Sequence, residues 1–368
     1  MTDFCPALKL RRKLTKKNWR WINEDRHQEI VKTEWSHLKA TLEKKMAASD
    51  DQILDISNEL FLACSNVTWA MLFGERCEAD DTDFLKFNKM KDWLLQGLVY
   101  STLSHGFPFL KGLPGNKLQY LELYKQACDE LIGKYYAQHV KTFDKDNIRD
   151  MLDAMLTEHE HLSKDNIEII ISDFLIAGVE TVASSLQFII HHLLQHKECA
   201  QKCRDELNEV VGADNELNFD MIPKLHYTNA VVAETMRLRP TAPITPPHKA
   251  IEDTTVLDYK VPKDTIVQVN IYAIHVDPKL HSEPLQYRPE RFLNEEGHYQ
   301  NIEGYLPFSL GRRECLGKAV ALKTLAFFTA EILRNFNLDV PAGHRLSDDV
   351  VCATTISPKP YSVHLKNR

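Results

Sequence analysis

The chain has 368 residues, of which 43% are hydrophobic and 26% charged, so it has the composition of an ordinary globular protein with material for a large core. Its formal net charge of −7 does not indicate a nucleic-acid partner. The eight cysteines are scattered rather than grouped with metal-ligand spacing, and we interpret them as reduced thiols facing a reducing compartment.

No linker rich in Pro, Gly or Ser interrupts the chain, and no internal repeat is visible, so we expect residues 1–368 to form a single domain. There is no run of eighteen consecutive apolar residues and no apolar leader near the N-terminus, which predicts neither a membrane span nor a secretion signal.

Hydrophobic periodicity predicts a mainly helical protein. Helices are expected over residues 7–23, 25–48, 53–72, 83–98, 118–139, 146–158, 163–196, 197–211, 227–238 and 316–336. Alternating segments predict strands over residues 254–256, 265–272 and 351–365, the last as a pair that turns near Ser357-Pro358. Residues 277–304 show little regular pattern. Two breaks flank an apolar connection that contains Phe107, Phe109 and Leu110, for which ordinary packing is the favoured role over contact with lipid or substrate.

The longest predicted helix, residues 163–196, carries Ala177, Gly178, Glu180 and Thr181 near its middle. A glycine inside a buried helix costs about 1 kcal/mol relative to alanine, so Gly178 needs a reason. One reason is a kink in the helix, and another is room for a small ligand beside it. Thr181 can accept or donate a hydrogen bond, and Glu180 can relay protons.

A loop from Phe308 to Gly317 ends on a cysteine, and a helical pattern begins directly behind it. A thiolate at Cys315 would be stabilised by backbone N–H groups at the start of that helix. Gly311 and Gly317 allow these amides to come close, and Arg313 can reach an anionic group. A free cysteine in a glycine-rich turn is the alternative for a cysteine that stands alone.

The pattern F-x-x-G-x-R-x-C-x-G, filled by this loop, resembles the haem-binding signature of the cytochrome P-450 family. The resemblance extends over residues 7–366 and implies the mainly α fold of that family with small β-sheets. It implies that Cys315 is the thiolate ligand of the iron of haem b and that Phe308 shields the sulfur from water. It also implies that Ala177, Gly178, Glu180 and Thr181 lie across the oxygen-binding face of the haem.

Further matches imply supporting roles. The segment Leu8-Lys9-Leu10-Arg11-Arg12 is similar to the family helix at the haem edge, with Leu8 in place of the family's tryptophan. Arg12 is therefore a candidate for a haem propionate, with a solvated basic face as the alternative. His248 is a second candidate by position, with an ordinary strand-end histidine as the alternative. Glu234 and Arg237, three residues apart on a helix, would join Arg291 of the Pro289-Glu290-Arg291-Phe292 segment in a structural network; an exposed ion pair is the alternative.

The resemblance implies a monooxygenase that inserts one atom of O2 into a lipophilic substrate. Within the family, the animal microsomal group that contains steroid 17α-hydroxylases is the most similar. Electrons would come from NADPH-cytochrome P-450 reductase, with cytochrome b5 as a further partner, at the cytosolic face of the endoplasmic reticulum membrane. The family's N-terminal anchor and first sheet strands have no counterpart before residue 7, which predicts a fold incomplete at its N-terminus. A haem-thiolate isomerase or dehydratase, or a remnant that binds no haem, are the alternatives.

Overall fold

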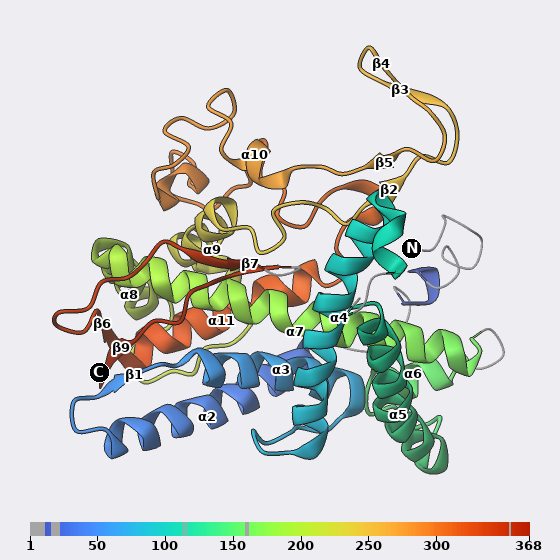
Figure 1. Cartoon of the computed structure of the whole chain (residues 1–368). Helices are drawn as coiled ribbons and strands as arrows, with labels where there is room; N and C mark the ends of the chain where they lie inside the picture. Colours follow the sequence, from blue (N-terminus) through green and yellow to red (C-terminus); the bar gives the residue numbers. More distant parts are fainter. Residues whose placement is uncertain (1–11, 16–22, 113–114, 116, 159–161, 353–354) are drawn as a thin grey trace. The chain divides into compact units, whose positions relative to one another are not determined.

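The computed structural model describes residues 12–15, 23–112, 115, 117–158, 162–352 and 355–368. These residues are mainly helical, as predicted from the sequence, with short strands confined to small sheets (Figure 1). The helices of more than one turn are α2 (Glu24–Ala48), α3 (Ser57–Phe73), α4 (Thr82–Gly106), α5 (Gln119–Thr142), α6 (Met151–Leu156), α7 (Lys164–Gln195), α8 (Lys197–Val210), α9 (His226–Leu238), α10 (Ile271–His275) and α11 (Lys318–Asn335). Short 3-10 helices are η2 (Pro108–Gly112), η3 (Ile222–Lys224), η4 (Pro289–Phe292) and η5 (Gly311–Arg313).

The chain divides into two compact units, which are described one at a time. The first unit contains Met1–Arg12, Val31–Phe61 and Thr181–Arg368, and the second contains Lys13–Ile30 and Leu62–Glu180. The expectation of a single domain stays a prediction.

A three-stranded antiparallel sheet joins distant parts of the first unit. Its strands are ordered β1 (Ile53–Leu54), β9 (Val363–Asn367), β6 (Phe336–Asp339). The central strand β9 buries Val363 and Leu365 completely, while Lys366 is exposed. Since β9 pairs Leu365 with Leu338 and His364 with Ile53, it closes the sheet between segments that are far apart in the sequence.

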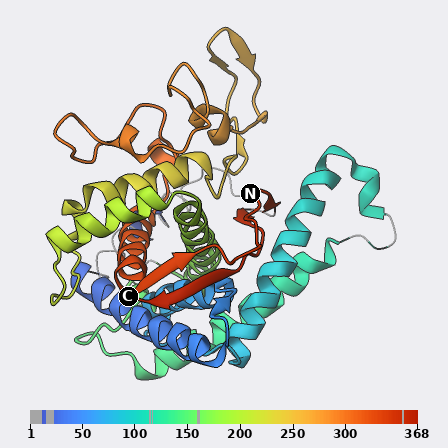
Figure 2. The same ribbon diagram turned by 90° about the vertical axis from the view of Figure 1, so that its left-hand side faces the viewer.

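Three two-stranded antiparallel sheets contain the other strands of the first unit. They are β2 (His248–Lys249) with β5 (Ile266–Val267), β3 (Thr254–Val256) with β4 (Tyr259–Val261), and β7 (Val350–Cys352) with β8 (Ile356–Pro358). Helices α8 and α11 lie side by side in this unit (Figure 2). On α11, Phe327 and Phe328 are buried, and Phe327 makes an edge contact with Phe219 with ring centroids 5.9 Å apart.

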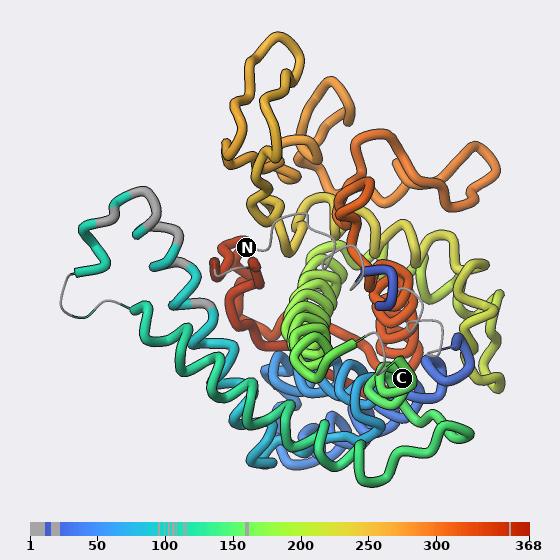
Figure 3. Tube along the Cα trace, turned by 90° about the vertical axis from the view of Figure 1, so that its right-hand side faces the viewer, coloured from blue at the N-terminus to red at the C-terminus, as the bar shows by residue number. Residues whose placement is uncertain are grey.

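In the second unit, α4 and α5 form a long helical pair (Figure 3). A Cβ atom on Gly97 would lie 2.6 Å from the side chain of Leu121, so a larger residue there would require Leu121 to shift. Beside this pair, Trp69 is fully buried among aromatic rings, with centroids 5.4 Å from Phe73 and 5.9 Å from Tyr135.

Several predicted boundaries were wrong. The helix expected from residue 53 begins at Ser57, because Ile53 and Leu54 form a strand with β9. The break expected near residue 104 does not end α4, which continues through Gly106. Phe107 and Phe109 are 56% and 68% exposed, so the favoured packing role for these two rings is wrong.

The C-terminal half contains further corrections. Of the strand expected over residues 265–272, only β5 forms, and Asn270 instead caps α10 by accepting a hydrogen bond from the Ala273 N–H at 2.9 Å. Ser357 and Pro358 lie within β8 rather than at the turn, and the strand β6 was missed. The predicted helix over residues 7–23 is helical at residues 12–15, and much of the rest of it lies outside the described residues.

Helix α7 bears on the prediction that the chain contains no membrane span. By length and composition it is apolar enough to cross a membrane, and half of its most apolar window is buried inside the protein. The core helix of a globular protein has the same properties, so this finding is weak evidence for a span.

Candidate functional site

The loop before α11 holds Cys315 in a tightly turned backbone. Ser309 and Gly311 both adopt positive φ angles, 59° and 69°, and the Ser309 N–H donates to the Leu306 carbonyl at 3.0 Å. The 3-10 helix η5 follows, and the Cys315 N–H then donates back to the Phe308 carbonyl at 3.0 Å. These bonds fix where the cysteine stands relative to the start of α11.

Cys315 is exposed to solvent, but neighbouring protein atoms still bury part of its side chain. The pKa of its thiol is raised above the ordinary value. Burial raises this pKa the most, and the nearby Glu314 carboxylate adds to the rise. The backbone N–H groups of Gly317 and Lys318 act in the opposite direction, as does the charge of Arg12. The start of α11 therefore provides the amide donors that the sequence predicted for a thiolate at this position.

Two arginines converge beside the cysteine. The Arg12 guanidinium donates to the Glu314 carbonyl at 3.2 Å. Its pKa is lowered first by burial and then by the positive charge of Arg313, while Cys315 raises it. Two like charges so close to each other are unfavourable unless an anionic group lies near both of them.

These residues fit a haem. An accessible sulfur, amide donors behind it and two neighbouring guanidinium groups match a planar cofactor that has an iron to ligate and two carboxylates to neutralise. The loop would leave room for such a group, because a Cβ atom on Gly311 would meet nothing within 4 Å and one on Gly317 would lie 4.0 Å from the sulfur.

The predicted oxygen-side residues all lie on α7, but they fall into different units. Thr181 belongs to the first unit, where its carbonyl accepts a hydrogen bond from the Ser185 hydroxyl at 2.8 Å. Ala177, Gly178 and Glu180 belong to the second unit. Ala177 is exposed although it lies in the middle of this long helix, and Glu180 is half-buried.

Gly178 has a structural reason that the sequence did not reveal. A Cβ atom at this position would lie 3.1 Å from the hydroxyl oxygen and 3.2 Å from the methyl carbon of Thr68 on α3. The glycine therefore permits close packing of α7 on α3 within the second unit.

Glu234, Arg237 and Arg291 form one network. Arg237 donates to both carboxylate oxygens of Glu234 at 2.7 and 2.8 Å, and Arg291 donates to one of them at 3.0 Å. Glu234 and Arg237 are fully buried. The remaining donors of both arginines go to backbone carbonyls of residues 275–286, so the network fixes the irregular segment that precedes the cysteine loop.

His275 is a positioning residue that sequence reasoning missed. It is fully buried on α10, its Nε2 accepts the Leu306 N–H at 2.8 Å, and its Nδ1 lies 2.9 Å from the Arg237 carbonyl. Since Nε2 accepts, Nδ1 carries the proton and donates. Burial is the main cause that lowers the pKa of His275 to about 4, which keeps the ring neutral. The histidine thus ties the Glu234 network to Leu306, which lies just before the cysteine loop and whose carbonyl accepts from the Ser309 N–H. His275 lies between the strand expected over residues 265–272 and the irregular segment that follows it, and nothing in that pattern signalled this role.

His248, the other propionate candidate, opens strand β2 and is half-buried. It pairs with Val267 of β5. Its role toward a haem stays a prediction.

A sequence model of the family described as Cytochrome P-450 matches residues 4–365. A steroid 17-alpha-hydroxylase/17,20 lyase of Rana dybowskii is 30% identical over 100% of this chain and 73% of its own length. The enzymes of the same name from Ictalurus punctatus and Equus caballus are 32% and 31% identical, and the chain covers 63% and 61% of them.

Among solved structures, a zebrafish cytochrome P-450 determined with progesterone superimposes with a TM-score of 0.86 at 28% sequence identity. The alignment covers 100% of this chain and 84% of that one.

Proposed function

Because the chain belongs to the cytochrome P-450 family and has its fold, we propose that it is a haem-thiolate monooxygenase that acts on a lipophilic substrate. The observation that carries the proposal is the Cys315 loop, where an accessible sulfur faces amide donors and two guanidinium groups. Haem b, when bound, would supply the activation of O2 and the insertion of one oxygen atom.

The chain's own residues would hold and serve that group. Cys315 would be the ligand of the haem iron, while Arg12, Arg313 and His248 are the candidates for binding the haem carboxylates. The half-buried ring of Phe308 would limit access of water to the sulfur. Gly311 and Gly317 leave space for the close approach of the macrocycle.

On the helix α7, Thr181 and Glu180 are the candidates for proton delivery. Glu180 is half-buried, so it can take up protons from solvent, and the Thr181 hydroxyl can pass them onward by donating and accepting hydrogen bonds. The small, exposed side chain of Ala177 would leave space on this helix, whereas Gly178 faces Thr68.

The substrate proposed is a steroid or a molecule of similar size and polarity. This rests on the relatives, which are steroid 17-alpha-hydroxylase/17,20 lyases, and on the zebrafish structure determined with progesterone. Phe107 and Phe109, whose ring centroids lie 6.2 Å apart, present apolar surface that suits contact with lipid or with a lipophilic substrate.

The proposed electron donor is NADPH-cytochrome P-450 reductase, with cytochrome b5 as a second partner, at the cytosolic face of the endoplasmic reticulum. Arg312 and Lys318 are exposed cations on the Cys315 loop and at the start of α11, where an acidic partner could dock. Lys318 is also paired with Glu314 at 2.9 Å.

The test is the carbon monoxide difference spectrum of the reduced protein after reconstitution with haem. We expect a thiolate-type band in the wild type, no such band in Cys315→Ala, and an unchanged band in Cys352→Ala. Cys352 is a suitable control because it is also an exposed free cysteine. Absence of haem absorption in the wild type would instead favour the non-enzymatic remnant.

The same preparation separates the two enzymatic readings. Substrate oxidation that requires NADPH and the reductase supports the monooxygenase. Conversion of a hydroperoxide without the reductase would indicate the haem-thiolate isomerase or dehydratase, although the presence of both Glu180 and Thr181 favours the monooxygenase.

A further inference from the structure

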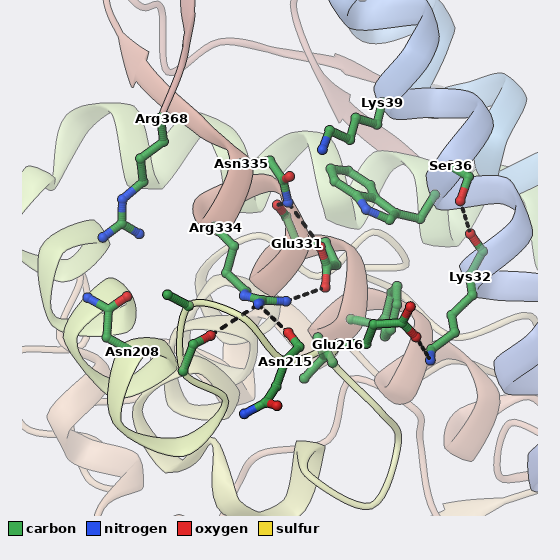
Figure 4. A pocket seen from close by; sticks show the side chains of 15 residues that line it. Lys32, Ser36, Lys39, Asn208, Asn215, Glu216, Glu331, Arg334, Asn335 and Arg368 are labelled. Carbon is green, nitrogen blue, oxygen red and sulfur yellow. Dashed lines mark hydrogen bonds and ion pairs between the residues drawn. The ribbon is translucent and has the colours of Figure 1, made fainter.

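A polar pocket of about 520 Å³ lies within the first unit, and none of its lining residues belongs to the Cys315 loop or to α7 (Figure 4). It is formed by α2, α8, α11, the loop of residues 212–217 and the C-terminal residue. The charged side chains that line it are Lys32, Lys39, Arg334, Arg368, Glu216 and Glu331. Four cations therefore face two carboxylates in a chain that is acidic overall.

Two of the cations are already paired with carboxylates that line the pocket. Lys32 binds Glu216 at 3.0 Å. Arg334 binds Glu331 at 2.9 Å and donates to the carbonyls of Gly212 and Asn215 at 3.2 and 2.7 Å. These contacts hold the 212–217 loop in place, so Lys32 and Arg334 have a structural role in the pocket and are not available to bind a ligand.

The other two cations are available. The Arg368 side chain makes no ion pair or hydrogen bond with any of the described residues, and its guanidinium points toward Asn208 (Figure 4). Lys39 has only a long contact of 3.9 Å to Glu43, and the two side chains are 39% and 43% exposed. Asn208 and the available cations thus offer hydrogen-bond donors from several directions.

A neighbouring arginine adds an independent observation. The pKa of Arg204 on α8 is lowered first by burial and then by the positive charge of Arg368. Its Nε is buried and has no hydrogen-bond partner among the described residues. Two guanidinium groups that repel each other beside a polar pocket would both be stabilised by an anion bound there.

We propose that this pocket binds a small soluble organic phosphate. A guanidinium presents paired N–H donors that match two phosphate oxygens, and Lys39 supplies a further charge for a ligand with a second anionic group. The volume lies within the range of about 300–1,000 Å³ that is typical of small-molecule sites. The proposal does not depend on haem binding or on the proposed reaction.

The test is isothermal titration calorimetry of the full chain with pyrophosphate as the probe, on wild type, Arg368→Gln and Lys366→Gln. Lys366, on strand β9 two residues before Arg368, is the matched control because it is exposed and does not line the pocket. We expect saturable binding of pyrophosphate to the wild type. The affinity should fall about tenfold in Arg368→Gln, because one charge-assisted hydrogen-bonding group is lost, and it should stay unchanged in Lys366→Gln. Binding should also weaken as salt is raised.

Two results would overturn the proposal. One is the absence of a saturable heat signal in the wild type up to about 10 mM pyrophosphate, a concentration above the dissociation constant of a weak specific complex. The other is equal affinity in the two variants. Co-sedimentation with lipid vesicles distinguishes a soluble phosphate ligand from a lipid headgroup. If Arg368→Gln reduces co-sedimentation with phosphatidic acid vesicles while pyrophosphate does not bind, the ligand is a lipid headgroup and the soluble ligand is excluded.

Discussion

At the scale of single residues, the position of the cysteine loop depends on one buried neutral histidine. His275 accepts from the Leu306 N–H and donates to the Arg237 carbonyl, so each of its nitrogens has a defined role. A protonated ring would lose the acceptor for Leu306 and would place a charge beside Arg237. The loop that carries Cys315 is therefore sensitive to the protonation of a residue outside it.

We predict that stability falls in acid because of this histidine. Its folded pKa is about 4, below the ordinary value of 6.5, so the unfolded chain binds the proton first as the pH falls. The stabilising contribution is complete above pH 6.5 and is lost between there and about pH 4. In urea unfolding, His275→Phe should reduce the dependence of the unfolding free energy on pH between 6.5 and 4. It should also lower the unfolding free energy at pH 7 by about 1–3 kcal/mol, since the Leu306 N–H loses its acceptor. His344→Phe, an exposed control, should retain the wild-type pH dependence.

At the scale of elements, two helix contacts in the second unit depend on specific side chains. One is the approach of α7 to α3 at Gly178 and Thr68. The other is the join between α5 and α6, where His139 lies 2.8 Å from the Asp150 carboxylate and Arg149 binds Asp153 at 2.6 Å.

The first contact predicts coupling between Gly178→Ala and Thr68→Ala. Alanine favours the helix by about 1 kcal/mol over glycine, but its Cβ atom would lie 3.1 Å from the Thr68 hydroxyl oxygen. With Thr68 shortened to alanine, that crowding disappears. Gly178→Ala should therefore be more favourable in the Thr68→Ala background than in the wild type, as measured by a double-mutant cycle of unfolding free energies. Strict additivity would contradict the packing role of the glycine.

The second contact has the geometry of a metal site but the bonding of an ion-pair network. Ligand atoms of His139, Asp150 and Asp153 all lie within 4.8 Å of one another. However, both Asp153 oxygens accept from Arg149, and the second Asp150 oxygen caps α6 by accepting the Asp153 N–H at 2.9 Å. These donors already satisfy the carboxylates, so the cluster is explained as a structural join.

We predict that this join is strongest at mildly acidic pH. Burial by itself lowers the pKa of His139, but the hydrogen bond and charge of Asp150, with smaller contributions from its other neighbours, outweigh it and the pKa is raised. The contribution to stability is thus full below the ordinary value of 6.5 and is lost as the pH rises through the folded value. The stability difference between wild type and His139→Gln should shrink as the pH rises above 6.5 in denaturant titrations. Asp150→Asn keeps the cap but removes the charge, and it should show the same loss of pH dependence.

At the scale of the whole molecule, the sequence predicted most long helices and the cysteine loop, because periodicity and a dense motif are local signals. It could not predict that Ile53 leaves a helical pattern to pair with His364, since a two-residue strand exists only through its distant partner. The roles of His275 and of Gly178 were hidden for the same reason. Their partners, Leu306 and Thr68, are brought to them by the fold.

The strand β9 therefore offers the clearest test of long-range organisation in the first unit. It pairs with both β1 and β6, and Leu365 is fully buried opposite Leu338. Leu365→Ala should cost about 2–5 kcal/mol, because it leaves a cavity at the centre of the sheet. Lys366→Ala removes an exposed side chain from the same strand and should change stability by less than about 0.5 kcal/mol. Denaturant unfolding followed by circular dichroism measures both, and equal effects would show that β9 does not organise the sheet as the register indicates.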